Sequence, residues 1–340
     1  MTRILIVKTS SMGDIIHTLP ALTDAARSLK DITFDWVVEE AFVEIPKWHP
    51  LVENIIQVPL RRFKKQKLHM IHNGEVALFF KQLRERQYDR VIDAQGLIKS
   101  ALITRFSRGL RCGLDRKSAW EPLASLAYQK RLHVDASQHA ITRMRQIFSQ
   151  ALDYPLVDSS PDYGIKIKTN YSTKNARYLL FIHGTTWETK EWPESYWIAL
   201  AKIANDKNYE VLLPWGNIKE QERAQRIAKA SNNVRVLEKS SLTEIAGILL
   251  SAAGTVSVDT GLGHLAAALN VPTVSIYGPT DPKETGALGA NQKHLTVNFK
   301  CSPCWSERCK FKEVSSVAPA CFASIPPEMV WNQLTKVIHD

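Results

Sequence analysis

The sequence predicts an α/β protein made of two doubly wound domains. The chain has 340 residues, which is more than one hydrophobic core usually organises. Apolar runs of strand length alternate with amphipathic stretches of helix length. A segment rich in Pro, Ser, Asp and Asn, residues 153–177, interrupts this alternation, so we expect the domain junction there.

The first half reads as a βαβ arrangement. "RILIVK" is a strand, "IIHTLPALTDAARSL" a helix and "ITFDWVVEE" a second strand. "YDRVIDAQG" repeats the pattern of a strand followed by a loop, and "SQHAITRMRQIFSQAL" has helical apolar spacing. We expect a Rossmann-like domain over residues 1–165; within the domain junction the brief "IKI" is a candidate strand.

The second half shows a longer alternation. The strands are "YLLFIHG", "YEVLLPWG", "VRVLE", "GTVSV" and "VPTVSIYG", and the helices between them are "PESYWIALAKIAND", "KEQERAQRIAKA", "SLTEIAGILLSAA" and "GLGHLAAAL". Ser241 and Glu244 have the spacing of a capping box. This succession predicts a second doubly wound parallel sheet over residues 166–324, followed by a helix in residues 325–340.

Charge and composition narrow the class of protein. The net charge of +10 lies mostly in residues 1–160, which hold 24 Lys and Arg against 17 Asp and Glu. Its densest run is "RRFKKQK", residues 61–67, which suits a solvated loop, an anionic substrate, a membrane surface or nucleic acid. No apolar stretch reaches the roughly 18 residues of a membrane span, and no secretion signal opens the chain, so we expect a cytoplasmic protein.

Loops at the ends of the predicted strands carry the chemistry in the second half. Asp259 ends a strand, Thr260 and the glycines after it open a helix, and helix N-termini bind phosphate. "HGTTWETKEWP" offers two hydroxyls and Lys190 to a diphosphate, and Glu220 is either a ribose ligand or an ordinary exposed helix residue. No Asp-x-Asp pair of the kind that holds a divalent metal is present. The pattern indicates a nucleotide-diphosphate site that works without metal.

Six segments together resemble one known family. "KTSSMGDIIHTLPAL", "VIDAQGLIKSA", "EPLASL", "HGTTWETKEWP", "LPWG" and "SVDTGLGHLAAAL…YGPTDP" are similar to the ADP-heptose:lipopolysaccharide heptosyltransferases of glycosyltransferase family 9, most closely the heptosyltransferase I enzymes. The resemblance runs from residue 3 to about residue 282 in the same order. It implies the GT-B architecture, two Rossmann-like domains facing a central cleft, with a last helix that returns to the first domain.

The resemblance also implies an activity and its site residues. It implies inverting transfer of heptose from ADP-heptose, held by the C-terminal domain, to a Kdo residue of Kdo-lipid A on the N-terminal one, with no metal or cofactor. Asp14 becomes the base. The implied donor ligands are Thr185, Thr186, Lys190, Glu220, Asp259, Thr260, Gly261, Leu262 and His264. The implied acceptor ligands are Lys8, Ser10, Arg61, Arg62, Lys64, Lys65 and Arg143.

Asp14 itself has two interpretations. No cation neighbours it within its loop, so it is free to accept a proton; alternatively it caps the helix that begins there.

Partners and alternatives follow from the same reading. We expect a monomer, peripheral on the cytoplasmic face of the inner membrane, with no nucleic acid bound. The alternatives are a heptosyltransferase II-like enzyme acting on a heptosylated core, a sugar-nucleotide epimerase, and a basic nucleic-acid-binding module. Four cysteines near the C-terminus, in a segment that resembles heptosyltransferase II, are either a structural zinc site or a reduced loop: Cys301, Cys304, Cys309 and Cys321.

Overall fold

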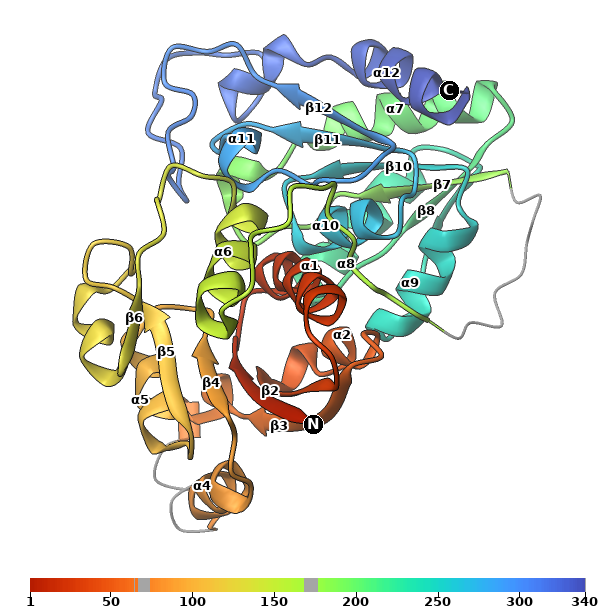
Figure 1. Ribbon diagram of the computed structural model, residues 1–340. Helices are drawn as coiled ribbons and strands as arrows, with labels where there is room; N and C mark the ends of the chain where they lie inside the picture. The colour runs from red at the N-terminus through yellow and green to blue at the C-terminus, as the bar shows by residue number, and fades with distance from the viewer. Residues whose placement is uncertain (64, 67–73, 168–176, 340) are drawn as a thin grey trace. The chain divides into compact units, whose positions relative to one another are not determined.

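The computed structural model of the protein describes residues 1–63, 65–66, 74–167 and 177–339. By its internal contacts the chain forms two compact units, Met1–Lys166 and Ile167–Asp340. Each unit is built on one six-stranded sheet whose paired strands all run parallel (Figure 1).

The sheet of the first unit has the order β3-β2-β1-β4-β5-β6. The strands are β1 (Thr2–Val7), β2 (Ile32–Glu39), β3 (Val52–Val58), β4 (Arg90–Asp93), β5 (Leu110–Leu114) and β6 (Lys130–Leu132). The helices are α1 (Met12–Ser28), α2 (Glu44–Lys47), α4 (Glu75–Glu85), α5 (Ile98–Phe106) and α6 (Ala140–Leu152), with 3₁₀ turns η1 (Glu40–Phe42) and η2 (Pro122–Ala127). Strand β1 is apolar on both faces because it lies at the sheet centre, where Ile4 to Val7 are fully buried.

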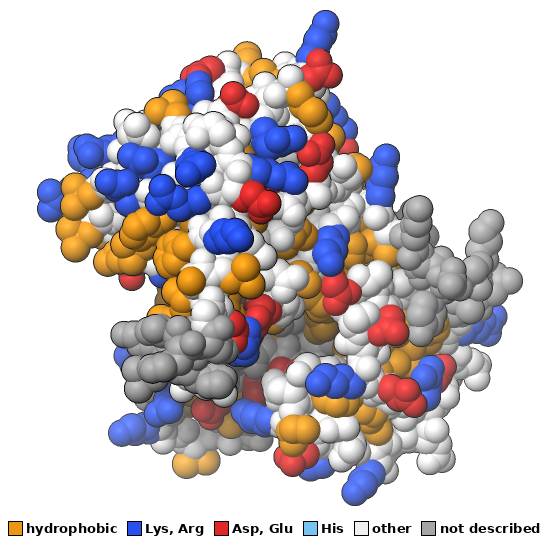
Figure 2. Space-filling model, turned by 90° about the horizontal axis from the view of Figure 1, so that it is seen from below, with side chains coloured by type: hydrophobic (Ala, Val, Ile, Leu, Met, Phe, Trp, Pro, Cys, Tyr) orange, Lys and Arg blue, Asp and Glu red, His pale blue; other side chains and the backbone are white. Residues whose placement is uncertain are grey.

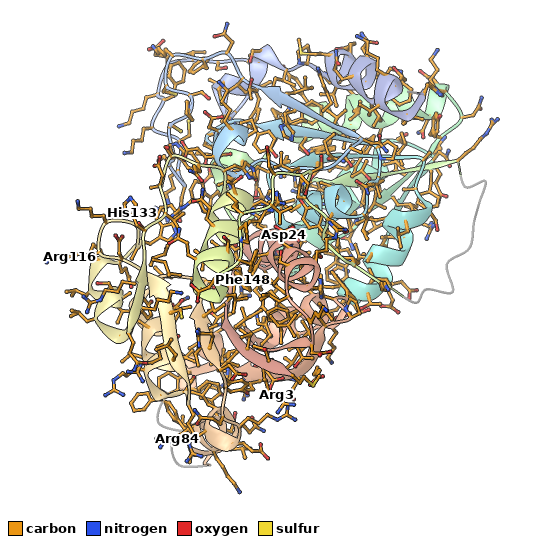
Figure 3. The ribbon with its side chains drawn as sticks, viewed as in Figure 1. Arg3, Asp24, Arg84, Arg116, His133 and Phe148 are labelled. Carbon is orange, nitrogen blue, oxygen red and sulfur yellow. The ribbon has the colours of Figure 1, made fainter. Side chains whose placement is uncertain are left out.

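Helices α1 and α6 lie side by side over this sheet, with Asp24 on the first and Phe148 on the second (Figure 3). Arg145 Nε donates to Asp24 Oδ2 at 2.5 Å, and both side chains are buried. Removing one partner of such a pair would leave a buried charge without a counter-charge, so the pair fixes the position of α1 on α6.

The sheet of the second unit has the order β12-β11-β10-β7-β8-β9. The strands are β7 (Tyr178–Ile182), β8 (Glu210–Leu213), β9 (Val234–Val236), β10 (Gly254–Val258), β11 (Thr273–Tyr277) and β12 (Gln292–Thr296). The helices are α7 (Glu194–Asp206), α8 (Ile218–Lys229), α9 (Leu242–Ser251), α10 (Gly261–Ala268), α11 (Pro282–Thr285) and α12 (Pro327–His339), with η3 (Glu188–Lys190) and η4 (Ala320–Ser324). The expected capping box is present: Ser241 N donates to Glu244 Oε2 at 2.7 Å, and Glu244 N donates to Ser241 Oγ at 3.2 Å.

Numbered within its own unit, each sheet has the strand order 3-2-1-4-5-6. The chain crosses from one side of the sheet to the other between strands 1 and 4, which are β1 and β4 in the first unit and β7 and β10 in the second. Ligands of open α/β sheets bind beyond the carboxyl ends of the strands at this crossing. Four loops therefore matter most, those that follow β1, β4, β7 and β10.

One detail differs from the sequence expectations. The "IKI" stretch forms no strand; Lys166 N donates to the carbonyl oxygen of Trp48 in an irregular segment. Helix α12 contacts α7, β10, β11 and β12 within the second unit, and Val330, Trp331 and Leu334 belong to that unit's core. The expected return of this helix to the first domain stays a prediction. Among the described helices, none is long and apolar enough to span a lipid bilayer.

Candidate active site

In the first unit, the loop after β1 brings a cation against Asp14. Lys8 is buried, and its Nζ lies 3.7 Å from Asp14 Oδ1. Ser11 is the N-cap of α1 and Asp14 stands three residues later; Ser11 N and Oγ donate to Asp14 Oδ2 at 2.9 and 2.6 Å. The expectation that Asp14 has no cation beside it is therefore corrected, because Lys8, the first residue after β1, supplies one. Asp14 is also not the N-cap itself.

These contacts fix the charge of the half-exposed Asp14. Desolvation by the surrounding residues would raise its pKa, but the Lys8 ammonium and the Ser11 hydrogen bonds outweigh it and hold the pKa of Asp14 at about 2. The carboxylate is thus ionised at neutral pH. It is in the protonation state that a general base needs, with its Oδ2 held by the backbone and its Oδ1 turned to Lys8.

The loop after β4 braces the loop after β1. Gln95 Oε1 accepts from Thr9 N and Thr9 Oγ1 at 2.9 and 2.7 Å, and Gln95 Nε2 lies 3.4 Å from Ser10 Oγ. Gln95 N donates in turn to Asp93 Oδ1, whose other oxygen accepts from Tyr128 at 2.7 Å. Ser10, an expected acceptor ligand, is therefore held at the crossing of this sheet by a buried network.

The run "RRFKKQK" contains no acidic residue, but carboxylates from other elements lie beside it in the folded chain. Arg62 donates to Glu40 Oε1 and Glu75 Oε2, both at 2.7 Å, so two carboxylates from other elements neutralise it. Arg61 stacks over the Phe42 ring at 5.0 Å, and Lys65 is exposed. Lys64 lies outside the described residues.

Arg143, on α6, is a buried cation with spare hydrogen-bonding capacity. Its Nη2 donates to the Ser118 carbonyl at 3.2 Å, and its guanidinium lies 5.2 Å from the Trp120 ring centre. Its buried Nε has no hydrogen-bond partner among the described residues. Burial lowers the pKa of Arg143, but an arginine stays charged. An anionic group would satisfy both the free donor and the charge.

In the second unit, Asp259 is the centre of a buried charged cluster. It follows β10, and its Oδ2 lies 2.7 Å from Lys190 Nζ and accepts from Thr280 Oγ1 at 2.7 Å. His264 Nε2 lies 3.6 Å from the other oxygen. Burial would raise the pKa of Asp259, but His264 and Lys190 outweigh it and hold the pKa well below its ordinary value. The aspartate thereby fixes both Lys190 and His264 beside the start of α10.

Helix α10 begins at this cluster. Thr260 is its N-cap residue, Gly261 and Leu262 come next, and no side chain caps its first turn. The first N–H groups of a helix have no partner within the helix and carry a partial positive charge, so they suit a phosphate. A Cβ on Gly263 would lie 2.6 Å from Ser257 Oγ, which is why only glycine lets the helix approach β10 so closely.

The loops after β7 and β8 complete the site. Thr185 Oγ1 donates to the Asp259 carbonyl at 3.2 Å, and Thr186 is exposed beside it. Glu220, at the start of α8, accepts from Gly216 N at 2.7 Å. A Cβ on Gly184 would stand 2.7 Å from Glu220 Cδ, so this glycine makes the room that the Glu220 side chain occupies. The expected donor residues of both loops therefore lie around the carboxyl ends of neighbouring strands.

Sequence reasoning missed Thr280 and Gln95. Thr280 holds Asp259, and Gln95 holds the loop that carries Ser10. Both stand directly after a strand at the carboxyl edge of a sheet, and both lie in segments that carry the family resemblance, "YGPTDP" and "VIDAQGLIKSA". Their position just after a strand, within segments that carry the family resemblance, is the signal that could have identified them as site residues.

The four cysteines of the C-terminal cluster lie around one small cavity. Within residues 1–63, 65–66, 74–167 and 177–339, no group of three or more His, Cys, Asp or Glu side chains is arranged to hold a metal ion. Cys301, Cys304 and Cys309 stand on an exposed loop, and Cys321 is half-buried in η4. All four thiols are free, and the two expectations for them, a structural zinc site and a reduced loop, both stay predictions.

The family model described as glycosyltransferase family 9 (heptosyltransferase) matches residues 76–315 of this sequence. The chain belongs to glycosyltransferase family 9. It is 49% identical to "Lipopolysaccharide heptosyltransferase 1" of Pseudomonas aeruginosa, over 99% of this chain and 98% of that one.

Two solved structures share the whole fold of this family 9 chain. The E. coli heptosyltransferase WaaC with ADP superimposes with a TM-score of 0.86 at 40% identity, covering 99% of this chain and 100% of that one. The same enzyme with ADP-2-deoxy-2-fluoro heptose gives 0.84 at 40% identity, covering 98% and 99%. The two doubly wound units are thus the GT-B architecture of family 9, as the sequence predicted.

The low pKa of Asp259 predicts acid sensitivity of the family 9 fold. Because the pKa is lower folded than unfolded, Asp259 stabilises the protein above its unfolded pKa of about 3.9, and this contribution is lost as pH falls below that value. We expect the urea midpoint of Asp259→Asn to fall less than that of the wild type between about pH 6 and pH 3. Equal slopes for the two proteins would contradict this.

Proposed function

We propose that the chain transfers L-glycero-D-manno-heptose from ADP-heptose to a Kdo residue of Kdo-lipid A, in the synthesis of the lipopolysaccharide inner core. The observation that carries this is the pairing of Lys190 with Asp259 at the uncapped start of α10, which offers a cation and free N–H groups to a diphosphate. A relative 40% identical over nearly the full chain was solved with ADP and with an ADP-heptose analogue. The near full-length match to a type 1 enzyme supports this acceptor over a heptosylated one.

The proposed reaction inverts the anomeric carbon in one displacement. The acceptor hydroxyl oxygen attacks that carbon, Asp14 takes the hydroxyl proton, and the bond from the carbon to the diphosphate oxygen breaks with its electron pair, so that ADP leaves. Lys8 keeps Asp14 ionised until then, and the backbone N–H of Ser11 fixes its orientation. Proton transfer to a positioned carboxylate contributes typically about 10²–10⁴-fold to such rates.

The leaving diphosphate gains negative charge as the bond breaks. We propose that Lys190 and the first N–H groups of α10, at Gly261 and Leu262, stabilise that charge, and that Thr185, Thr186, Thr260 and His264 hold the phosphates and the heptose. We propose Glu220 as the ribose ligand: one of its carboxylate oxygens accepts from Gly216 N, and the other is offered to the ribose hydroxyls. Preorganised donors of this kind lower the barrier because they need no rearrangement during the reaction.

The acceptor is proposed to bind through the first unit. Kdo carries a carboxylate and lipid A carries phosphates, so Arg143 with its free buried Nε, Lys8 and Ser10 are proposed as its central contacts. Arg61 and Lys65 add charge, and Arg62 would exchange a glutamate for the acceptor. Because this acceptor is lipid-linked, we propose that the enzyme works at the cytoplasmic face of the inner membrane. We also propose that it works as a monomer.

One assay tests the function and its alternatives. The protein is incubated with ADP-heptose and, separately, with Kdo-lipid A, phosphorylated Kdo-lipid A and heptosylated acceptor, and the products are weighed by mass spectrometry. We expect one heptose to be added to an acceptor that ends in Kdo, with release of ADP. Transfer to the heptosylated acceptor alone would assign the type II reaction, and epimerised ADP-heptose without transfer would refute the proposal.

Metal removal is expected to leave the rate unchanged. In the proposal the negative charge of the diphosphate is stabilised by the Lys190 ammonium and by helix N–H groups, which the chain itself supplies. Activity in excess EDTA should equal activity with added Mg²⁺ in the same buffer. A strict requirement for Mg²⁺ would overturn the role given to Lys190.

A further inference from the structure

The outer face of α5 exposes a row of apolar side chains. Ile98, Leu102 and Phe106 follow one another at intervals of four residues, so they share one side of the helix. Their exposures are 43, 54 and 45%. The opposite side of the helix is buried against the first unit through Ala101 and Ile103.

The 3₁₀ turn η2 extends this row. It contacts α5, with Ala101, Ala124 and Tyr128 forming a small core beneath the two. Leu123 and Leu126 of η2 are 63 and 72% exposed, and Trp120 just before it is 71% exposed. These six large apolar side chains, which we call the α5/η2 face, gather in one part of the surface. Contiguous exposed patches of this kind mark binding surfaces more often than scattered residues do.

Uncompensated cations surround the α5/η2 face. Residues 97–134 hold eight Lys and Arg against two acids, a large part of the chain's net charge of +10. Six of the eight are exposed: Lys99, Arg105, Arg108, Arg116, Lys117 and Arg131. None of the ion pairs among the described residues includes any of these six.

The figures agree with this grouping. Figure 2 shows Lys and Arg side chains beside hydrophobic ones at the left of the face in view. Figure 3 shows Arg116 at the outer edge of the first unit.

Both acidic residues of this segment accept hydrogen bonds from backbone N–H groups. Glu121 Oε2 accepts from Ile98 N at 2.5 Å at the start of α5. Asp115 Oδ1 accepts from Lys117 N and Ser118 N at 3.1 and 2.8 Å, and its other oxygen contacts His133. The positive charge around the apolar side chains is therefore available to an outside partner.

We infer that the α5/η2 face docks on an anionic phospholipid surface, with its aliphatic side chains among the lipid headgroups and its cations on the phosphates. An apolar row flanked by Lys and Arg is the composition that binds at a membrane interface, and each basic residue there adds attraction to anionic lipid. A second copy of the chain fits less well, because a symmetric contact would bring two sets of six cations together.

The inference rests on the proposed function, whose acceptor is held in a membrane, and it names the surface that meets that membrane. The Trp120 ring lies 5.2 Å from the Arg143 guanidinium, so the α5/η2 face borders a proposed acceptor residue. Docking through this face would present lipid headgroups directly beside Arg143.

Vesicle sedimentation tests the docking directly. The apolar variant is Leu102→Gln/Leu123→Gln/Leu126→Gln, and the charge variant is Lys99→Gln/Arg116→Gln/Lys117→Gln. Matched controls from the second unit are Leu250→Gln/Met329→Gln, which are 45 and 41% exposed, and Lys202→Gln/Lys207→Gln. On vesicles of phosphatidylglycerol and phosphatidylcholine we expect the charge variant to lose about fivefold in partition for each charge removed, and to lose most of its salt dependence.

The apolar variant should bind the same vesicles at least about tenfold more weakly than the wild type, because three aliphatic side chains no longer enter the headgroup layer. Both controls should bind like the wild type. All variants change exposed residues, and circular dichroism and thermal unfolding check that they fold. Wild-type partition by both triple variants would overturn the inference. The inference would also be overturned if the wild type had the mass of a dimer, and the apolar variant had the mass of a monomer with unchanged vesicle binding. The α5/η2 face would then join two copies of the chain.

An activity arm separates this inference from the proposed function. With acceptor in vesicles the two triple variants should show a raised KM, whereas with a deacylated, water-soluble acceptor they should match the wild type. If the wild type transfers heptose to no acceptor, the proposed function fails. The vesicle measurements still show whether the α5/η2 face binds anionic lipid. If the wild type transfers heptose and both triple variants bind vesicles as the wild type does, the proposed function stands and the inferred docking surface is wrong.

Discussion

Replacing Asp14 by asparagine is expected to lower turnover by about 10²–10⁴-fold while leaving ADP binding unchanged. Asparagine retains an oxygen that accepts from Ser11 N, so the start of α1 keeps its hydrogen bond, but the base is gone. Single-turnover rates with saturating ADP-heptose measure the first effect, and calorimetric titration with ADP measures the second.

The control for Asp14 is Ser11→Ala. It removes the Ser11 Oγ contact and a helix cap, at a cost of about 1 kcal/mol of stability, but it leaves the carboxylate and Lys8 in place. We expect it to keep most of the turnover. If Asp14→Asn turned over like the wild type and Asp14→Ala lost only stability, Asp14 would serve the helix start and not the chemistry.

Replacing Lys190 by alanine is expected to lower kcat/KM for ADP-heptose by about 10²–10³-fold and to cost about 3 kcal/mol of stability. The two losses have different causes. The rate falls because no ammonium stabilises the charge of the leaving diphosphate. The stability falls because the Asp259 side chain, which is 5% exposed, loses the positive charge that lay 2.7 Å from it.

A second substitution separates the two causes. Adding Asp259→Asn to Lys190→Ala removes the unpaired buried charge, so the free energy of unfolding should recover while kcat/KM should not. Lys219→Ala is the matched control: its ion pair with Glu191 is at the surface and its removal should cost less than about 1 kcal/mol. Recovery of activity in the double variant would show that Lys190 acts only through the fold.

Most strands inside the two sheets could be predicted, whereas three of the four edge strands could not; the exception is the edge strand β9, predicted from "VRVLE". β1, β2, β7, β10 and β11 are buried along most of their length and mainly apolar, because helices cover both faces of the sheet. β3, β6 and β12 stand at sheet edges, where "VENIIQV", "KRL" and "QKHLT" are partly exposed and lack a continuous apolar run. β5 was missed because "LRCGL" is short and carries a charge and a glycine.

The site was predictable as a set of residues but not as a set of contacts. Strand ends pointed to Asp259, Lys190 and Thr185, since parallel strands deliver their loops to one edge. That Lys190 pairs with Asp259, 69 positions later, depends on β7 lying next to β10, which no local pattern encodes. The neutralisation of Arg62 likewise comes from Glu40 and Glu75, which only the folded chain brings to it.

The repeated strand order 3-2-1-4-5-6 has a consequence for how such enzymes diversify. Each unit has its own crossing point: the proposed acceptor residues Lys8 and Ser10 follow β1 at one, and the proposed donor residues Thr185 and Asp259 follow β7 and β10 at the other. Selection for a new acceptor can therefore rework the loops after β1 and β4 without disturbing Asp259 or Lys190. A lineage can in this way keep one activated sugar and explore many recipients, and a chimaera that joins the second unit to a foreign first unit should inherit its donor.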